Sequence, residues 1–160
     1  MRTPRLDDLI AHFIQRLREK DLQVRAGAAL AEIQAFERKN AVQLPIEMTE
    51  FYLGIDGMDS AEIDPESHIR MYGIGDLQPL TELLPEYSRG IPNAQHAFVV
   101  ADYLMWSLGY AVWLSDTILG ATPVFLVGDG NPIRVSASFE EFIALFAHNS
   151  PALLPTKSLG

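Results

Sequence analysis

Apolar residues recur every three or four positions over the first twenty residues, with polar residues between them. This spacing places them on one face of an α-helix and predicts a helix over 4–20. Thr3 and Pro4 suit its start, because threonine caps free backbone N–H groups and proline tolerates the first helical position. Asp7 and Asp8 follow where the helix dipole favours acids. The apolar face consists of Leu6, Leu9, Ile10, Phe13, Ile14 and Leu17.

The same periodicity predicts two further helices before residue 60. One runs over 26–39 and ends at Asn40, a plausible capping residue. The other begins with Pro45 at its first position and stops at Gly54 and the Asp56-Gly57 pair. The core-facing residues are Leu30, Ile33 and Phe36 in the first of these helices, and Met48, Phe51, Tyr52 and Ile55 in the second.

After an acidic loop over 58–67, the pattern becomes typical of β-structure. Apolar runs predict strands over 68–73, 97–101, 123–127 and 133–135, and one or two more within 103–114, broken near 107–109. Residues 77–87 predict a short helix or turns, since Pro79 and Pro85 limit a longer helix. The glycines of 128–131 predict a hairpin turn between the last two strands.

Ser138 and Glu141 form a capping-box pattern, which predicts a closing helix that ends near Asn149. Helices first, an antiparallel meander next and a helix last are typical of the α+β class. We therefore expect a central, mainly antiparallel sheet flanked by N-terminal helices and a closing C-terminal helix. The length of 160 residues suits one domain.

Charge is distributed unevenly along the chain. The total is −9, from 12 Lys and Arg against 21 Asp and Glu. Residues 1–40 hold eight bases and six acids, whereas 41–160 hold four bases and 15 acids. Between Asn40 and His68 there are seven acids and no base. This stretch is either a solvated loop or a face for a basic partner, and the acidic balance disfavours direct nucleic-acid binding.

No apolar run reaches the roughly 20 residues that a membrane helix needs, and the N-terminus lacks the apolar region of a secretory signal. We therefore expect a cytoplasmic protein without membrane contact. The chain has no cysteine, which excludes disulfides, thiolate metal sites and thiol nucleophiles.

The remaining residues offer no recognisable catalytic pattern. No Gly-x-Ser-x-Gly elbow surrounds a serine, and the four histidines lack metalloprotease spacing. The carboxylates from Asp56 to Asp64 do not follow calcium-loop spacing, because Met58 and Ala61 occupy required positions. Asp102 at a strand end is interpreted as a turn acid rather than half of an acid–base pair. We expect no enzyme, no metal and no cofactor.

Four sequence blocks, in order over residues 30–146, resemble the SUKH superfamily, the SMI/KNR-type domain. The first is Ile33-x-x-Phe36-Glu37 with Leu44-Pro45, and the second is Phe51-x-x-Gly54-x-Asp56-Gly57. The third is Phe98-Val99-Val100-Ala101-Asp102 with Tyr110-Ala111-Val112-Trp113-Leu114. The fourth is Pro123-Val124-Phe125 with Ser136-x-Ser138-Phe139-Glu140-Glu141-Phe142.

This resemblance implies an α+β interaction domain without a catalytic signature. Bacterial members are often immunity proteins that neutralise toxins delivered between cells, and fungal members are regulatory. The implied organisation is an N-terminal helix over 1–25, packed on the core or appended to it, a SUKH-like domain over 26–150 and a tail over 151–160.

The resulting hypothesis is an immunity protein that binds a basic toxin domain, with a nuclease as one example. Acids would supply charge complementarity, and exposed aromatics would anchor the contact. The predicted contact residues are Glu47, Glu50, Asp56, Asp59, Glu62, Asp64, Tyr103 and Trp106. Two alternatives stay open: a regulatory or scaffold domain of the same fold, and a small enzyme or ligand-binding protein with a pocket near Asp102.

Overall fold

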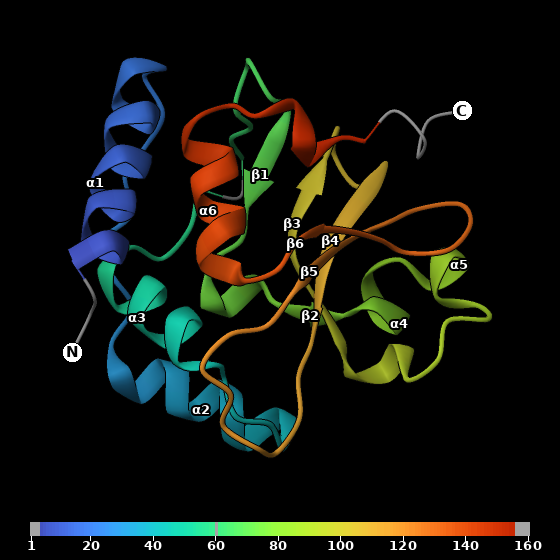
Figure 1. The fold of residues 1–160 in the computed structure, drawn as a ribbon. Coiled ribbons are helices and arrows are strands. Elements are labelled where there is room, and N and C mark those ends of the chain that lie inside the picture. The colour runs from blue at the N-terminus through green and yellow to red at the C-terminus, as the bar shows by residue number, and fades with distance from the viewer. Residues whose placement is uncertain (1–3, 60, 156–160) are drawn as a thin grey trace.

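The computed structural model describes residues 4–59 and 61–155. These residues form an α+β fold, with an antiparallel sheet of six strands, helices before it in the chain and a helix after it (Figure 1). The predicted fold class is therefore confirmed. The predicted Thr3 cap lies outside the described residues.

The helices and strands have the following bounds. The α-helices are α1 (Pro4–Glu19), α2 (Leu30–Asn40), α3 (Ile46–Gly54), α4 (Leu80–Leu83), α5 (Pro85–Ser88) and α6 (Phe139–Ala147). The strands are β1 (Ile69–Met71), β2 (Gln78–Pro79), β3 (Ala97–Tyr103), β4 (Leu108–Trp113), β5 (Val124–Val127) and β6 (Ile133–Ser136). Short 3₁₀ turns cover Ile74–Asp76, Ala94–His96 and Pro151–Leu153.

The sheet is ordered β1-β3-β4-β5-β6, and β2 pairs with the same edge of β3 as β1 does. In β3 the register shifts between Val99 and Ala101, and the Val100 carbonyl accepts a hydrogen bond from the backbone N–H of Tyr72. A β-bulge of this kind changes where the following side chains point. Beyond it, Arg70 on β1 stands directly opposite Asp102 on β3.

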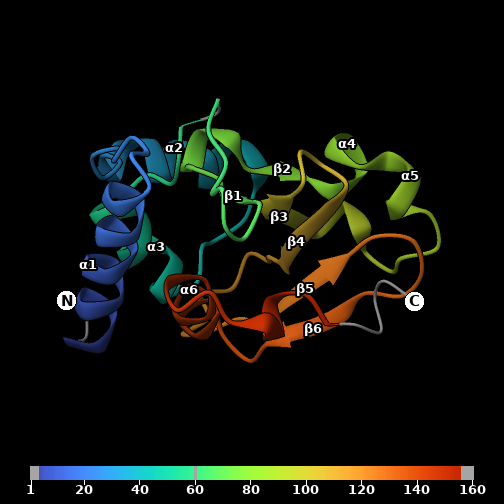
Figure 2. The same cartoon turned by 90° about the horizontal axis from the view of Figure 1, so that it is seen from above.

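Helices cover both faces of the sheet (Figure 2). Tyr110 on β4 packs against Phe142 of α6, with ring centroids 5.1 Å apart. The neighbouring Gly109 faces the opposite way, toward Leu84 between α4 and α5. Helix α1 lies alongside α6 and also contacts α3, so α1 belongs to the layer on the α6 side.

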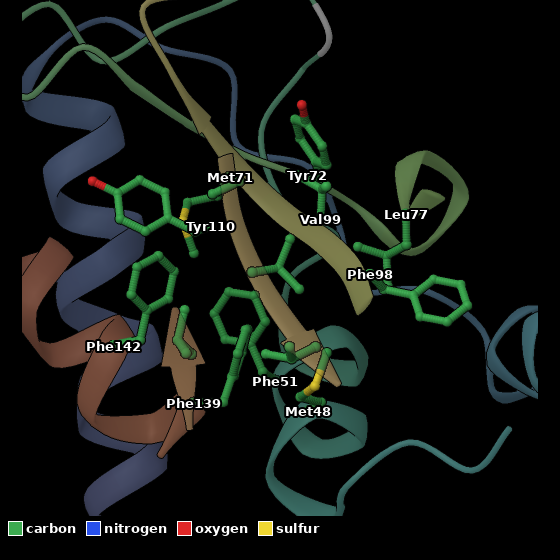
Figure 3. Packing of buried hydrophobic residues seen from close by; sticks show 14 of the residues in the cluster. Met48, Phe51, Met71, Tyr72, Leu77, Phe98, Val99, Tyr110, Phe139 and Phe142 are labelled. Carbon is green, nitrogen blue, oxygen red and sulfur yellow. The ribbon is translucent and has the colours of Figure 1, made fainter. Parts of the chain in front are cut away.

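Aromatic rings dominate the core between the helices and the sheet (Figure 3). Phe13 of α1 packs against Phe51 of α3 and Phe146 of α6, at centroid distances of 5.5 and 5.1 Å. Phe51 in turn meets Phe139 at 5.3 Å. Burial of these large rings accounts for much of the hydrophobic stabilisation, and it fixes α1, α3 and α6 relative to one another.

The second helix differs from its prediction at its start. It begins at Leu30 rather than Ala26, and Leu30 is 51% exposed instead of facing the core. The preceding residues are extended because they pair with the end of α3: Ala26 bridges Ile55, and the N–H of Ala28 donates to the Tyr52 carbonyl at 2.8 Å. These long-range hydrogen bonds override the local helical pattern.

Two element boundaries were also predicted wrongly. The break within 103–114 lies at Leu104–Ser107, and Gly109 is inside β4. Pro45 is the cap of α3 rather than its first helical residue. The closing helix agrees with its capping pattern, since Ser138 Oγ accepts from the Glu141 N–H at 3.0 Å, although the Glu141 carboxylate reaches back to the N–H of Ala137.

Candidate functional site

The turn between β3 and β4 presents three successive apolar side chains to solvent. Leu104, Met105 and Trp106, here called the hairpin tip, are 44%, 70% and 49% exposed. Large apolar residues grouped on a surface in this way mark a contact site more often than scattered ones do. Trp106 was predicted from the sequence as an anchor, whereas Leu104 and Met105 were not.

The hairpin tip also has an unusual backbone. Its residues have φ values of 50°, 51° and 72°, in the left-handed region that costs an L-residue about 1–2 kcal/mol. Surrounding hydrogen bonds fix this conformation: the Leu104 N–H donates to the His68 carbonyl, and the Tyr87 hydroxyl donates to the Ser107 carbonyl, both at 2.9 Å. Strain held in place by its surroundings is typical of functional positions.

A small cavity lies behind the hairpin tip. Its volume is about 80 Å³, and Met105 and Trp106 form one side of it. Residues 61–63, on the loop before β1, line it as well. Arg70 and Asp102, the opposed residues of β1 and β3, supply its buried polar groups.

Hydrogen bonds and charge hold the polar groups of this cavity together. The Tyr72 hydroxyl donates to Asp102 Oδ2 at 2.7 Å, and Arg70 Nη2 lies 3.6 Å from the same oxygen. The Arg70 guanidinium also lies over the Tyr72 ring, 4.4 Å from its centroid. Burial, reinforced by the hydrogen bond to Asp102, raises the pKa of Tyr72, so the hydroxyl stays protonated as a donor.

The interpretation of Asp102 as a turn acid is wrong. Asp102 is buried, because β3 continues to Tyr103 and places its side chain under the hairpin tip. The sequence contained a signal for the burial of Asp102, because Arg70 and Asp102 are charged residues within or beside apolar strand patterns. Charges in such positions require a partner, and here each charge partners the other.

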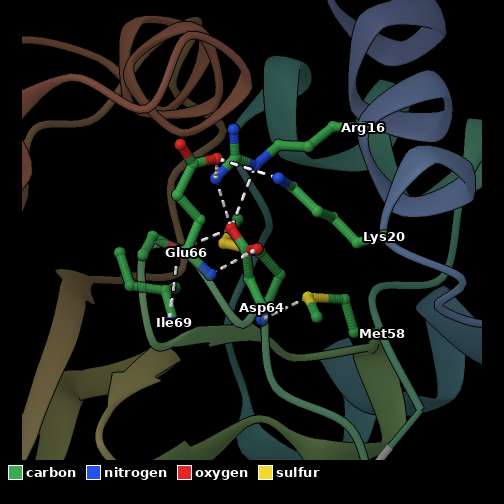
Figure 4. Close-up of polar contacts among 8 residues, drawn as sticks. Arg16, Lys20, Met58, Asp64, Glu66 and Ile69 are labelled. Carbon is green, nitrogen blue, oxygen red and sulfur yellow. Dashed lines mark hydrogen bonds and ion pairs between the residues drawn. The ribbon is translucent and has the colours of Figure 1, made fainter.

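The acidic segment between α3 and β1 folds against the basic residues of the N-terminal region. Arg16 Nε lies 3.0 Å from Asp64 Oδ2, and Arg16 Nη2 lies 3.2 Å from Glu66 Oε1 (Figure 4). Lys20 Nζ approaches the same Glu66 oxygen at 3.3 Å. These acids are largely neutralised within the molecule, so the base-free stretch of the sequence is not a continuous free acidic face.

Two of the predicted contact acids are therefore structural. Asp64 has no exposed surface and cannot contact a partner in this fold. Burial acts to raise its pKa, but hydrogen bonds from Arg16 and Ser67 outweigh burial and lower it. Asp56 accepts from the Ile74 N–H at 2.7 Å and pairs with Arg25 at 3.5 Å, while its burial raises its pKa.

Glu47 also acts inside the fold. Its Oε1 accepts from the backbone N–H groups of Phe139, at 2.6 Å, and Thr122, at 3.2 Å. It thus joins α3 to the start of α6 and to the loop before β5. Burial raises the pKa of Glu47, and the two backbone hydrogen bonds offset part of this effect. Glu50 is half-buried on the same helix.

The other predicted contact residues retain exposed surface. Asp59 and Glu62 are half-exposed; Asp59 Oδ1 accepts from the Ala61 N–H and Glu62 Oε1 from the Gln23 N–H, each at 2.9 Å. Tyr103 is half-buried against the core. Of the eight predicted residues, Glu62 and Trp106 come together in the lining of the cavity.

Across residues 4–59 and 61–155, no group of three or more histidine, aspartate or glutamate side chains is placed to hold a metal ion. In the same residues, none of the helices has the length and apolar character needed to cross a membrane.

No protein-family model matches the chain, and a search of the curated proteins finds none that matches it. The resemblance to the SUKH superfamily therefore depends on the four sequence blocks alone.

Proposed function

We propose that this chain is a protein-binding domain. Its contact surface consists of the hairpin tip and of Asp59 and Glu62, two acids of the loop between α3 and β1. The observation that carries the proposal is the hairpin tip itself: three apolar side chains held outward on a left-handed backbone. This arrangement costs folding free energy twice, through strain and through apolar exposure, and binding a partner would recover the second cost.

A basic protein is the partner that the charge favours. The chain carries −9, and Arg16 and Lys20 of its N-terminal region are already engaged by its own acids. Such a field accelerates encounter with a positive surface, while a buried aromatic anchor supplies most of the affinity. With the SUKH resemblance, this supports an immunity protein that occludes a basic toxin domain, such as a nuclease.

Growth protection tests this proposal. A basic toxin domain is expressed together with the chain or with a variant of it, and a reading frame next to the gene is the first source to search for that domain. We expect wild type and Ile118→Ala to protect the cells, and Trp106→Ala to fail. Ile118 is a matched control, because it is a 60% exposed apolar residue on the loop between β4 and β5. Full protection by Trp106→Ala would contradict the proposed surface, and tight binding without protection would favour a regulatory role.

A further inference from the structure

Arg70 is a buried cation with unused hydrogen-bonding capacity. The residue is only 8% exposed, and its Nη1 is buried without a hydrogen-bond partner. Its contact with Asp102 is a single one of 3.6 Å through Nη2, and not the two-pronged pairing that arginine and a carboxylate usually form. A buried donor without an acceptor is costly, and Arg70 lines the cavity behind the hairpin tip.

The charges around the cavity restrict what can occupy it. Arg70 contributes one positive charge, and Asp102 and Glu62 contribute two negative charges. A carboxylate ligand would enter against both acids, and an ammonium or guanidinium ligand would face Arg70. A neutral group with both an acceptor and donors avoids both conflicts, because its oxygen can accept from Arg70 while its N–H groups face carboxylates.

We propose that this cavity binds a primary carboxamide, the group found on asparagine and glutamine side chains. The amide oxygen accepts from the Arg70 guanidinium, and the amide N–H groups donate to the carboxylates of Asp102 and Glu62. The contacts of Asp102 with Tyr72 and Arg70 both use Oδ2. The flat amide fits a cavity of about 80 Å³ beside the Trp106 indole. This inference goes beyond the proposed function, since it requires no protein partner.

NMR titration with propionamide tests the proposal on the chain alone. The chain has two tryptophans, and the Trp113 indole N–H donates to the Pro92 carbonyl at 3.3 Å, so its signal serves as an internal reference. We expect saturable shifts of the Trp106 indole and Arg70 Nε–H signals with propionamide, and none with propionate. Absence of a saturable shift, or equal shifts with propionate, would overturn the proposal and favour water as the occupant.

Two arginine variants control the titration. Arg70→Lys keeps the charge but loses the planar donor fork, so propionamide affinity should fall about tenfold, as expected for losing one charged hydrogen bond. Arg134→Lys, on an exposed position of β6, should leave it unchanged. Both variants must retain the wild-type amide spectrum outside the cavity. Unchanged affinity in a folded Arg70→Lys protein would contradict the assignment.

Peptide probes distinguish the source of the amide. Acetyl-Ala-Gln-Ala-N-methylamide is compared with its Glu counterpart and with free L-glutamine. Tighter binding of the Gln tripeptide assigns the cavity to a protein side chain, and tighter binding of L-glutamine assigns it to a small ligand; both results support carboxamide recognition. Equal binding of the Gln and Glu tripeptides would contradict it.

Discussion

Asp64 is a fully buried carboxylate that links α1 to the loop before β1. Arg16, the Ser67 hydroxyl and the Glu66 N–H all donate to it, at 3.0, 2.7 and 3.2 Å. The Arg16 guanidinium lies in turn over the Phe146 ring of α6. Through Arg16, Asp64 therefore joins the loop before β1 to α1 and α6. These contacts explain why this polar loop is ordered in the fold.

Asp64→Asn should lower the free energy of unfolding by about 3 kcal/mol at pH 7, because it leaves the buried Arg16 with only the exposed Glu66 as a counter-charge. The pKa of Asp64 is lowered in the folded state, so its stabilisation is present above its ordinary value of 3.8 and is lost as pH falls through the lower folded value. Urea unfolding at pH 7 and at pH 3 measures this. Asp129→Asn, on the exposed β5–β6 turn, is the control. Equally small losses of stability in Asp64→Asn and Asp129→Asn would refute the buried pair of Arg16 and Asp64.

Glu47→Gln should instead raise the free energy of unfolding at pH 7. Gln keeps an oxygen for the Phe139 and Thr122 N–H groups but avoids burying a charge. Since the pKa of Glu47 is raised in the folded state, wild type loses stability as pH rises through that pKa. The variant should thus be more stable than wild type at pH 7, and this gain should vanish below the ordinary value of 4.5. A loss of stability at pH 7 would show that the charge itself is needed there.

At the scale of elements, the β3–β4 hairpin carries the proposed contact surface at a cost in stability. Its tip combines exposed apolar side chains with three successive left-handed residues. An asparagine tolerates that backbone better than methionine does and is polar. The same substitution should therefore improve folding and impair binding.

Met105→Asn should raise the free energy of unfolding by about 0.5–1 kcal/mol and weaken partner binding. Thermal or urea unfolding checks the first effect, and a binding titration checks the second. Leu119→Asn is the matched control, because Leu119 is exposed but does not have a positive φ. Should Met105→Asn destabilise the fold, the tip would not be strained.

Helix α1 is another element whose role the structure defines. Phe13 inserts between Phe51 and Phe146, so α1 completes the core rather than lying loosely on it. Phe13→Ala should lower the free energy of unfolding by about 3–5 kcal/mol, measured by urea denaturation. Leu30→Ala, at an exposed position of α2, should change it by less than about 0.5 kcal/mol. Similar small losses in both variants would mean that the core forms without α1.

Local patterns predicted the elements whose ends are decided locally. Helix α6 was identified correctly from its capping residues, and the β5–β6 turn from its glycines. Both elements depend on interactions between residues that are close in sequence. The start of α2 was wrong, since Ala28 bonds to Tyr52 across the fold. The pairing of Arg70 with Asp102 was not foreseen for the same reason: it depends on strand register, which one sequence does not reveal.

At the scale of the whole molecule, the charge of −9 is arranged in two ways. Part of it is neutralised where Arg16, Lys20 and Arg25 meet the acids of the loop between α3 and β1. The half-exposed Asp59 and Glu62 remain on the same loop, with Glu62 beside the hairpin tip. Binding should therefore be sensitive to salt through these two acids rather than through Asp64.

A double variant, Asp59→Lys with Glu62→Lys, should slow association with a basic partner and flatten its dependence on salt, while leaving the fold intact. Asp64→Lys, by contrast, should unfold the chain, because it places a second cation against Arg16. Stopped-flow association at low and moderate salt, with circular dichroism as the folding control, separates the two outcomes. An unchanged salt dependence in the double variant would show that the charge steering arises elsewhere.

The dissociation constant of the complex with a basic toxin domain tests the central claim most directly. It is compared for wild type, Trp106→Ala and Ile118→Ala, each shown to be folded. We predict that Trp106→Ala weakens binding about 30-fold, the loss of about 2 kcal/mol typical of an interface anchor, while Ile118→Ala has no effect. Equal affinities for Trp106→Ala and wild type would contradict the assignment of the hairpin tip as the partner-binding surface.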